Sequence, residues 1–361
     1  MNRSATHRRA FLVGAASTAA IAGLGSYGLI GAARAAEGRK IITVGGRRVK
    51  TVDIHGHCVI PAVADVVANT PFAIDDFPGN QTLGPARIQA LDARGIDVQV
   101  LSINQYWWYA AERELAANIV RTHDEGLADW VGSNPERFVA LSSVALQYPD
   151  LAAEQLEYAV NELGLRGASV SGTVNGEVPS TEKYDPFWAK AEELNVPVFM
   201  HPTNGNNVLN DAVMEGSGNL SNIIGNPLET TLFLSKLIFD GTLDRFPGLK
   251  VCGAHGGGYL PSYFERTEIT CDVRRNARCM NQKRPRDYLT TQIFADSMVF
   301  TEEGLRHLVA EMGASQIVYG TDMPFNWPDT ADLIANVDFL SDAEKEAILG
   351  GNLIAMLKIA A

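Results

Sequence analysis

The sequence predicts an α/β fold: a (β/α)8 barrel of the TIM type, preceded by a short N-terminal hairpin. Two observations support this prediction. Short apolar runs alternate with longer segments of helical periodicity, and reactive side chains stand at the ends of those runs, where a barrel collects its reactive groups. The eight apolar runs cover residues 52–58, 98–103, 138–146, 167–171, 196–201, 250–255, 292–296 and 317–321.

The other elements follow in chain order. A hairpin is expected at residues 40–50, because Gly45 and Gly46 at its centre suit a tight turn. The clearest helices are residues 112–134, 152–163 and 184–194, where apolar residues recur on one side. Residues 204–228, rich in Asn and Gly, should form a long loop after the fifth strand, and loops of this length are often functional lids.

Residues 1–36 are expected to be a targeting segment outside the fold. The pair Arg8-Arg9 precedes an uncharged run rich in Gly and Ala, which ends in the small-x-small sequence Ala33-Arg34-Ala35. This pattern resembles a twin-arginine export signal with a signal-peptidase site. It implies a periplasmic protein whose mature part, residues 37–361, is a single barrel domain without stable membrane insertion. Retention of the segment as an N-terminal anchor is the alternative.

The charge of the chain argues against one class of partner. The full sequence has a formal charge of −12, and removal of residues 1–35 takes away four arginines and no acidic residue, which leaves −16. Nucleic acid, itself a polyanion, is therefore not expected as a partner. A small-molecule substrate is expected instead.

The four cysteines lack the C-x-x-C spacing of a structural zinc site. Cys58 and Cys252 fall within apolar runs and should be buried as small hydrophobic residues. Cys271 and Cys279 are candidates for a disulfide in an oxidising compartment.

Five polar side chains end predicted strands. His55 and His57 close the first strand, His201 the fifth, His255 the sixth and Asp322 the eighth. Alternate residues of a strand share one face, so His55 and His57 are spaced to share a metal ion. For any one of these residues, a buried structural role is the alternative; five together at strand ends favour a functional site.

Four of the five are candidate ligands of one divalent metal ion: His55, His57, His201 and Asp322. Neutral imidazoles and one carboxylate, with a position left open, allow a metal to activate water or to polarise a substrate oxygen. Zinc is the expected ion, and manganese suits the same donors.

Two histidines of the barrel domain do not end strands. His123 and His307 lie in segments with helical periodicity. Both are expected at the solvated surface, with no part in the site.

Longer motifs surround the strand-end residues. They are Met200-His201-Pro202, Ala254-His255-Gly256-Gly257-Gly258 followed by Leu260-Pro261, Tyr319-Gly320-Thr321-Asp322-Met323-Pro324-Phe325, Arg87-Ile88 through Leu101-Ser102, Asp296-Ser297, and Gly351-Asn352. This set resembles the amidohydrolase superfamily. More narrowly, it is similar to the branch that contains 2-amino-3-carboxymuconate-6-semialdehyde decarboxylase and the aromatic-acid decarboxylases.

The resemblance implies roles for individual residues. His255 would be the catalytic acid/base rather than a ligand, a task that suits histidine because its ordinary pKa is near working pH. Asp322 would serve catalysis as well as the metal. Residues 167–171 contain no lysine to bridge two metals, which implies a mononuclear site. Arg266 would reach a substrate carboxylate across the interface of a homodimer; a surface ion pair on its helix is the alternative.

The expected activity is decarboxylation of a small aromatic or enoic carboxylic acid by a carbon–carbon lyase. Trp107 and Trp108 follow the second strand and are candidates to line a pocket for a planar ring. Packing of their loop onto the neighbouring helix is the alternative. Two other functions remain open: metal-dependent hydrolysis of an ester, lactone or amide by the same residues, and a non-catalytic binding protein on a barrel scaffold.

Overall fold

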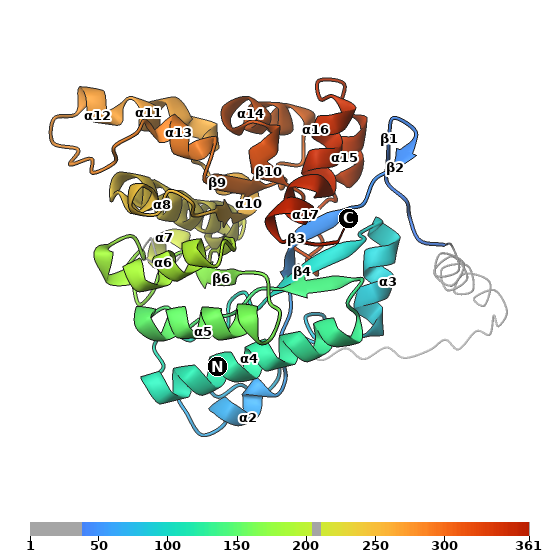
Figure 1. Cartoon of the computed structure of the whole chain (residues 1–361), viewed down its shortest axis with the longest axis vertical. Coiled ribbons are helices and arrows are strands. Elements are labelled where there is room, and N and C mark those ends of the chain that lie inside the picture. Colours follow the sequence, from blue (N-terminus) through green and yellow to red (C-terminus); the bar gives the residue numbers. More distant parts are fainter. Residues whose placement is uncertain (1–37, 204–210, 361) are drawn as a thin grey trace, which may run out of the picture. The chain divides into compact units, whose positions relative to one another are not determined.

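Eight parallel strands form the centre of the fold (Figure 1). The computed structural model describes residues 38–203 and 211–360, so the predicted signal at residues 1–36 lies outside the described residues. The strands are β3 (Val52–His57), β4 (Val98–Ser102), β5 (Phe138–Ala140), β6 (Ala168–Ser171), β7 (Val198–His201), β8 (Val251–Gly253), β9 (Ile293–Asp296) and β10 (Ile317–Val318). Each lies within one of the eight apolar runs.

The strands fall into two parallel sheets, β3-β4-β5 and β6-β7-β8-β9-β10. Backbone hydrogen bonds join the sheets at both seams. The Ser142 N–H donates to the Gly167 carbonyl at 2.8 Å, and the Ile54 N–H donates to the Tyr319 carbonyl at 3.0 Å. The strands therefore follow one another around a barrel in chain order, which confirms the predicted fold class.

Every strand is somewhat shorter than its apolar run, and two of them, β10 and β5, end three or more residues before the run does. The eighth run was expected to extend to residue 321, yet β10 ends at Val318. Beyond it the N–H groups of Gly320 and Thr321 donate to side chains, namely Ser297 Oγ and Asp53 Oδ1. Backbone donors used in this way are not available to a strand ladder. The third run behaves similarly, since β5 ends at Ala140.

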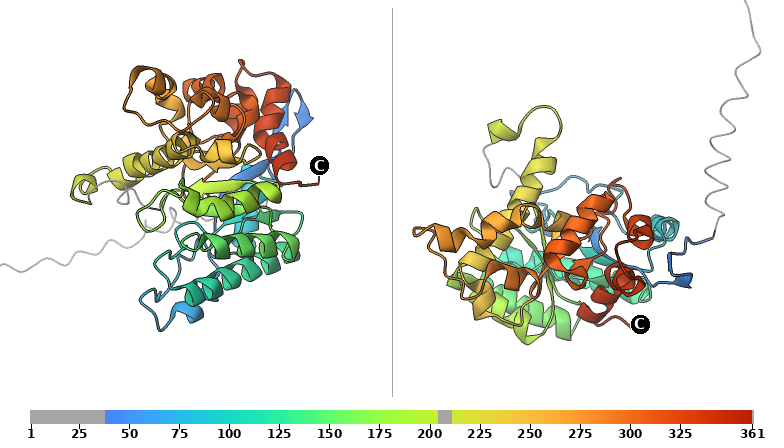
Figure 2. Two further views of the ribbon diagram at one scale, coloured as in Figure 1. Left: turned by 60° about the vertical axis from the view of Figure 1, so that its left-hand side comes forward. Right: turned by 90° about the horizontal axis from the view of Figure 1, so that it is seen from above.

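Helices surround the strands (Figures 1 and 2). They are α2 (Val63–Val67), α3 (Pro85–Arg94), α4 (Arg113–Ser133), α5 (Pro149–Asn161), α6 (Asp185–Glu193), α7 (Asp211–Met214), α8 (Asn226–Phe239), α9 (Thr242–Arg245), α10 (Ala254–Gly257), α11 (Phe264–Glu268), α12 (Thr270–Val273), α13 (Pro285–Leu289), α14 (Glu302–Met312), α15 (Ala331–Asn336), α16 (Asp342–Glu346) and α17 (Asn352–Met356). The three predicted helices correspond to α4, α5 and α6. Helix α5 begins earlier than predicted because Pro149 suits the first turn of a helix.

Helix α4 corrects one expectation. His123 was predicted at the surface, but it lies between Ile119 and Leu127 at four-residue spacing, on the buried face of the helix, and is 1% exposed. Its ring stacks on Trp108, with centroids 5.9 Å apart, and its Nδ1 lies 3.2 Å from Ser143 Oγ. The surface prediction for His123 was therefore wrong; His307 is exposed as expected.

The N-terminal hairpin forms as predicted. Strands β1 (Thr43–Val44) and β2 (Arg47–Arg48) pair antiparallel around Gly45 and Gly46, whose φ angles are 56° and 76°. Two consecutive positive φ values are characteristic of the type I′ turn, which joins the two strands of a hairpin through a two-residue loop. Glycine adopts these values without steric cost.

The segment after β7 is more helical than predicted. Residues 204–210 lie outside the described residues, but α7, a π-helical turn η3 (Ser221–Gly225) and the start of α8 occupy most of residues 211–228. Pro227 stands in the first turn of α8, a position that proline commonly occupies. The expectation of an irregular loop over residues 204–228 is wrong for the described part.

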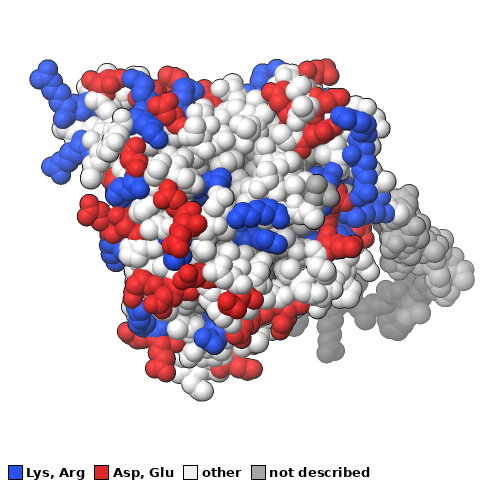
Figure 3. All heavy atoms as spheres, viewed as in Figure 1, with Lys and Arg blue, Asp and Glu red and all other residues white. Residues whose placement is uncertain are grey.

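The remaining sequence features have clear positions. Cys271 and Cys279 form a disulfide, while Cys58 and Cys252 are free and buried, as expected. Within the described residues, no helix has the length and apolar character to cross a membrane. On the face shown in Figure 3, acidic and basic side chains are interspersed.

Alternate strand residues pack inside the barrel and support the site. The inner cluster contains residues from seven of the eight strands or from positions next to them: Ile54, Val100, Leu141, Phe199, Cys252, Phe294 and Val318. The ring of Phe199 meets that of His55 edge-on, with centroids 5.2 Å apart. The imidazoles therefore rest on packed apolar side chains, which restrict their movement.

Candidate metal centre

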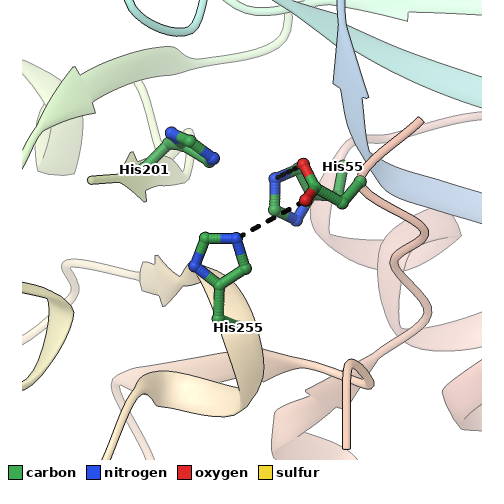
Figure 4. Close-up of side chains that lie close together, drawn as sticks. His55, His201 and His255 are labelled. Atoms are coloured by element: carbon green, nitrogen blue, oxygen red, sulfur yellow. Dashed lines mark ion pairs between the residues drawn. The ribbon is translucent and has the colours of Figure 1, made fainter. Parts of the chain in front are cut away.

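The five strand-end residues converge at one end of the barrel. His55 and His57 end β3, His201 ends β7, His255 follows β8 within α10, and Asp322 follows β10. Figure 4 shows His55, His201 and His255 pointing toward one another from three different elements. The structure thus brings together all the ligand and acid/base candidates that the sequence indicated.

The carboxylate of Asp322 lies at the centre of this group. Its Oδ1 is 2.7 Å from His57 Nε2 and 3.1 Å from His55 Nε2, and its Oδ2 is 3.8 Å from His255 Nε2. One ligand atom each from His55, His201, His255 and Asp322 fall within 4.8 Å of one another. The donor atoms are therefore close enough to surround a single ion.

The donor set fits a divalent metal. His55 Nε2, both ring nitrogens of His57, His201 Nδ1 and Asp322 Oδ1 are buried without a hydrogen-bond partner among the described residues. Their short mutual contacts lack hydrogen-bond geometry, so each atom would lose its solvation without compensation. Imidazole nitrogens with one carboxylate oxygen match the preferences of zinc and manganese. This cluster is a divalent metal site.

Electrostatics support the same conclusion. Burial lowers the pKa of His57, and burial together with the surrounding imidazoles lowers that of His201 well below its ordinary value. Both rings are therefore neutral, as metal ligands must be. Burial also disfavours the charged form of His55. The carboxylates of Asp322 and Asp296 outweigh this effect and raise the pKa of His55 to about 10. Two buried carboxylates thus need a positive partner, which is a proton on His55 or a metal ion.

Asp296, at the end of β9, is not one of the ligand candidates but orients His55 and His255. Its Oδ2 lies 2.7 Å from His55 Nδ1 and accepts the backbone N–H of His255 at 3.0 Å, while its Oδ1 accepts that of Gly256 at 2.7 Å. A carboxylate on Nδ1 leaves Nε2 of His55 free to face the metal. The sequence motif Asp296-Ser297 predicted no role for Asp296; its position at a strand end was the available signal.

His255 occupies a left-handed turn. Its φ is 58°, and Gly256, Gly257 and Gly258 follow with φ between 65° and 74°. A Cβ at Gly258 would lie 2.2 Å from the Pro227 carbonyl oxygen, so only glycine fits there. The turn presents the His255 side chain to the pocket with 16% exposure, whereas those of His55 and His57 have none.

A cavity of about 550 Å³ lies over the centre, a size typical of small-molecule sites. Its described lining is His57, Gln105, His201, Asn219, Asn222, Ile223, Asn226, His255, Asp322, Phe325, Asn326 and Trp327. Amide side chains are numerous in this wall, and sequence reasoning missed them. The Asn-rich composition of residues 204–228 was the signal that could have found three of them.

The predicted substrate-binding aromatics lie elsewhere. Trp107 is buried, donates its indole N–H to the Ser169 carbonyl at 2.9 Å and stacks on Tyr109. Trp108 stacks on His123 of α4. Neither belongs to the described lining of the central cavity; these rings pack their loop onto neighbouring elements, and a contact with substrate stays a prediction.

Arg266 lies on α11 with an exposed side chain and is not among the described residues that line the cavity of its own chain. Its predicted role requires a second subunit. It therefore stays a prediction.

The comparisons with known proteins agree with this geometry. The profile of the amidohydrolase family matches residues 52–359, and the chain belongs to this family. It is 32% identical over 280 residues to 2-amino-3-carboxymuconate-6-semialdehyde decarboxylase of Dictyostelium discoideum, covering 75% of each chain. It is also 32% identical over 292 residues to gamma-resorcylate decarboxylase of Rhodococcus jostii, covering 76% of this chain and 87% of that one.

A solved structure shares the fold. The structure of 5-carboxyvanillate decarboxylase from Novosphingobium aromaticivorans, with bound manganese, has a TM-score of 0.78 and 21% identity, covering 88% of this chain and 100% of that one. The curated relatives above are decarboxylases. The predicted carboxy-lyase is thereby confirmed over the hydrolase and the binding protein.

Proposed function

We propose that this enzyme decarboxylates a small aromatic carboxylic acid at the metal centre, with His255 as the proton donor. The observation that supports the role of His255 most directly is its position: it is the partly exposed imidazole of the cluster and lines the cavity beside the buried ones. Aromatic acids are the substrates named for similar decarboxylases, which supports this substrate class.

His55, His57, His201 and Asp322 are assigned as the ligands. His255 also lies within ligand distance, so the choice between His57 and His255 rests on two differences. The His57 side chain is fully buried, and its Nε2 lies 2.7 Å from Asp322, against 3.8 Å for His255. A metal ligand is expected close to the buried carboxylate of Asp322, whereas the acid/base must be accessible to the substrate.

The reaction then follows from the residues. A divalent metal bound by His55, His57, His201 and Asp322 would supply positive charge that holds and polarises the substrate's oxygens. The imidazolium of His255 donates a proton to the ring carbon that bears the carboxylate, and the bond to the carboxylate carbon breaks. Carbon dioxide leaves, and the bonding electron pair restores the aromatic ring. Asp296 fixes the backbone of His255, which keeps the donor in place.

The metal is proposed to be zinc, with manganese as the alternative that the manganese-bound relative favours. Mass spectrometry of the purified mature chain, beside His57→Ala, tests the assignment. About one zinc or manganese per chain, lost in the variant, supports the mononuclear site. A protein without stoichiometric metal would contradict it.

Activity is tested with two substrate panels. Gamma-resorcylate and 5-carboxyvanillate probe carbon dioxide release, and simple aryl esters and lactones probe hydrolysis. Release of carbon dioxide without acid formation from the esters supports the proposal. The opposite result would return the hydrolase to first place.

Two further proposals concern the context of the enzyme. Residues 1–36 are proposed to export it to the periplasm through a twin-arginine-type signal, tested by fractionation of cells with Arg8 and Arg9 replaced by lysine. A homodimer is proposed in which Arg266 approaches the partner's site. Sedimentation as a monomer at micromolar concentration would remove that argument.

A further inference from the structure

A second, smaller cavity opens beside the central one. It has a volume of about 250 Å³, and its described lining is Asn222, Ile223, Pro227, His255, Met298, Phe300 and Trp327. Four of these, Asn222, Ile223, His255 and Trp327, also line the central cavity. The proposed proton donor therefore stands at the junction of the two spaces. A substituent on a ring held at His255 can reach the smaller cavity directly.

The two cavities differ in chemistry. The central one is rich in amides, which offer both donors and acceptors to hydroxyl or carboxylate groups. The smaller one is lined mainly by apolar side chains, among which Phe300 and Trp327 stack with centroids 5.6 Å apart and an interplanar angle of 16°. Such a surface gains free energy by burying apolar groups and offers little to charged ones.

Phe300 has properties that folding alone does not explain. Its φ is 51°, which is unusual and costly for a bulky residue. The residue is 37% exposed, so a large part of its apolar surface is not stabilised by burial in the core. An aromatic ring kept half-exposed on a strained backbone, next to the reactive site, indicates a binding surface.

The charges around both cavities restrict the substrate further. Neither described lining contains a lysine or arginine, and that of the central cavity contains the carboxylate of Asp322. The metal and the proposed Arg266 of a second subunit would serve the reacting carboxylate, so a second substrate carboxylate would be desolvated here without a cationic partner, which is costly. An uncharged substituent has no such penalty.

We propose that Ile223, Met298, Phe300 and Trp327 form an apolar subsite that receives an uncharged hydrophobic substituent of an aromatic monocarboxylic acid. The proposal rests on the proposed function, because it assumes an aromatic acid bound at His255. It adds that the substrate extends from the metal centre past His255, with its polar groups toward the amides and its apolar arm between Phe300 and Trp327.

The test is a titration of the metal-loaded enzyme with salicylate and its methyl, phenyl and carboxyl derivatives, substituted meta or para to the carboxylate. Isothermal calorimetry gives the Kd of each, and carbon dioxide release is recorded separately. The best methyl derivative should bind about fourfold more tightly than salicylate, from the transfer free energy of one buried carbon. The best phenyl derivative should gain at least about tenfold, and the carboxyl derivatives should bind more weakly than salicylate.

Two variants locate the effect. Phe300→Gly removes the ring, and glycine accepts the positive φ at this position without strain. The variant should therefore fold, but it should lose most of the increase in affinity for phenyl derivatives over salicylate. Tyr158→Ala is the control. Tyr158, on α5, is an aromatic residue with 40% exposure, close to the 37% of Phe300. This variant should keep the increased affinity for phenyl derivatives.

The outcomes separate the two proposals. Phenyl derivatives that bind no more tightly than salicylate, or not at all, overturn the subsite, and so does a full gain in Phe300→Gly. Tighter binding of phenyl derivatives without any carbon dioxide release leaves the subsite standing and overturns the proposed decarboxylation of this substrate class. Carbon dioxide release without a phenyl preference does the reverse.

Discussion

Replacing Asp296 by asparagine should weaken metal binding 10- to 100-fold, although Asp296 is not itself a ligand. The carboxylate is surrounded by four donors: His55 Nδ1 at 2.7 Å and the backbone N–H groups of His255, Gly256 and Met298 at 3.0, 2.7 and 3.3 Å. An asparagine has one acceptor oxygen, so its NH₂ group must face some of these donors. Loss of a charge-assisted hydrogen bond costs about 1.5–3 kcal/mol. Replacing a residue that hydrogen-bonds to a metal ligand typically lowers metal affinity by a factor of about 10–100, which corresponds to about 1.4–2.7 kcal/mol and agrees with that cost.

The assay is competition for zinc or manganese with a chromophoric chelator at neutral pH. Asp329→Asn is the matched control, because Asp329 Oδ1 also accepts two hydrogen bonds, from the Tyr319 hydroxyl at 2.7 Å and the Ala331 N–H at 2.9 Å, but lines neither cavity. The control should retain wild-type affinity. An unchanged metal Kd in a folded Asp296→Asn protein would refute the reasoning, and an equal loss in both variants would show a general effect on stability.

Three further predictions follow from the same structure. His255→Gln should keep about one metal per chain and lower kcat by about 10²- to 10⁴-fold, the range for loss of a general acid; near-normal turnover would exclude His255 as proton donor. Removal of the metal by a chelator should lower the melting temperature, because it uncovers buried donors and carboxylates, and an unchanged melting curve would place the metal elsewhere. Burial raises the pKa of Asp124 to about 7, from 3.8 when unfolded, despite hydrogen bonds from Ser142 and Ser143. Between these two pH values, Asp124 therefore stays protonated in the native state, whereas it is ionised in the unfolded chain. The free energy of unfolding of the wild type, measured against Asp124→Asn by urea titration, should rise by about 2 kcal/mol as pH falls from about 7 to about 5; a difference independent of pH would contradict this.

Periodicity and strand-end residues predicted much of the fold and the metal centre. Eight apolar runs gave eight strands, and the H-x-H pair of β3 lies where the alternation of strand residues required. These inferences succeeded because they depend on local repeats and on the rule that barrel strands all present their carboxyl ends to one face. The ligand candidates, separated by up to 267 residues in the sequence, could be grouped for that reason alone.

Side-chain environments could not be predicted in this way. His123 was expected at the surface because histidine is polar, although it stands at the four-residue spacing of Ile119 and Leu127 that marks the buried face of α4. Trp107 and Trp108 follow the correct strand, yet their rings turn toward Ser169 and His123. Which of several directions a loop residue takes depends on packing partners that are distant in sequence.

The sequence by itself therefore determined the barrel, the five polar residues at its mouth and the family chemistry that they indicate. Tertiary structure alone decided that Asp296 holds both His55 and the His255 backbone, and that Phe300 and Trp327 meet beside His255. The physical reason is that periodicity is a local property of the chain, whereas these contacts join the ends of different strands and are fixed only when the barrel brings those ends together.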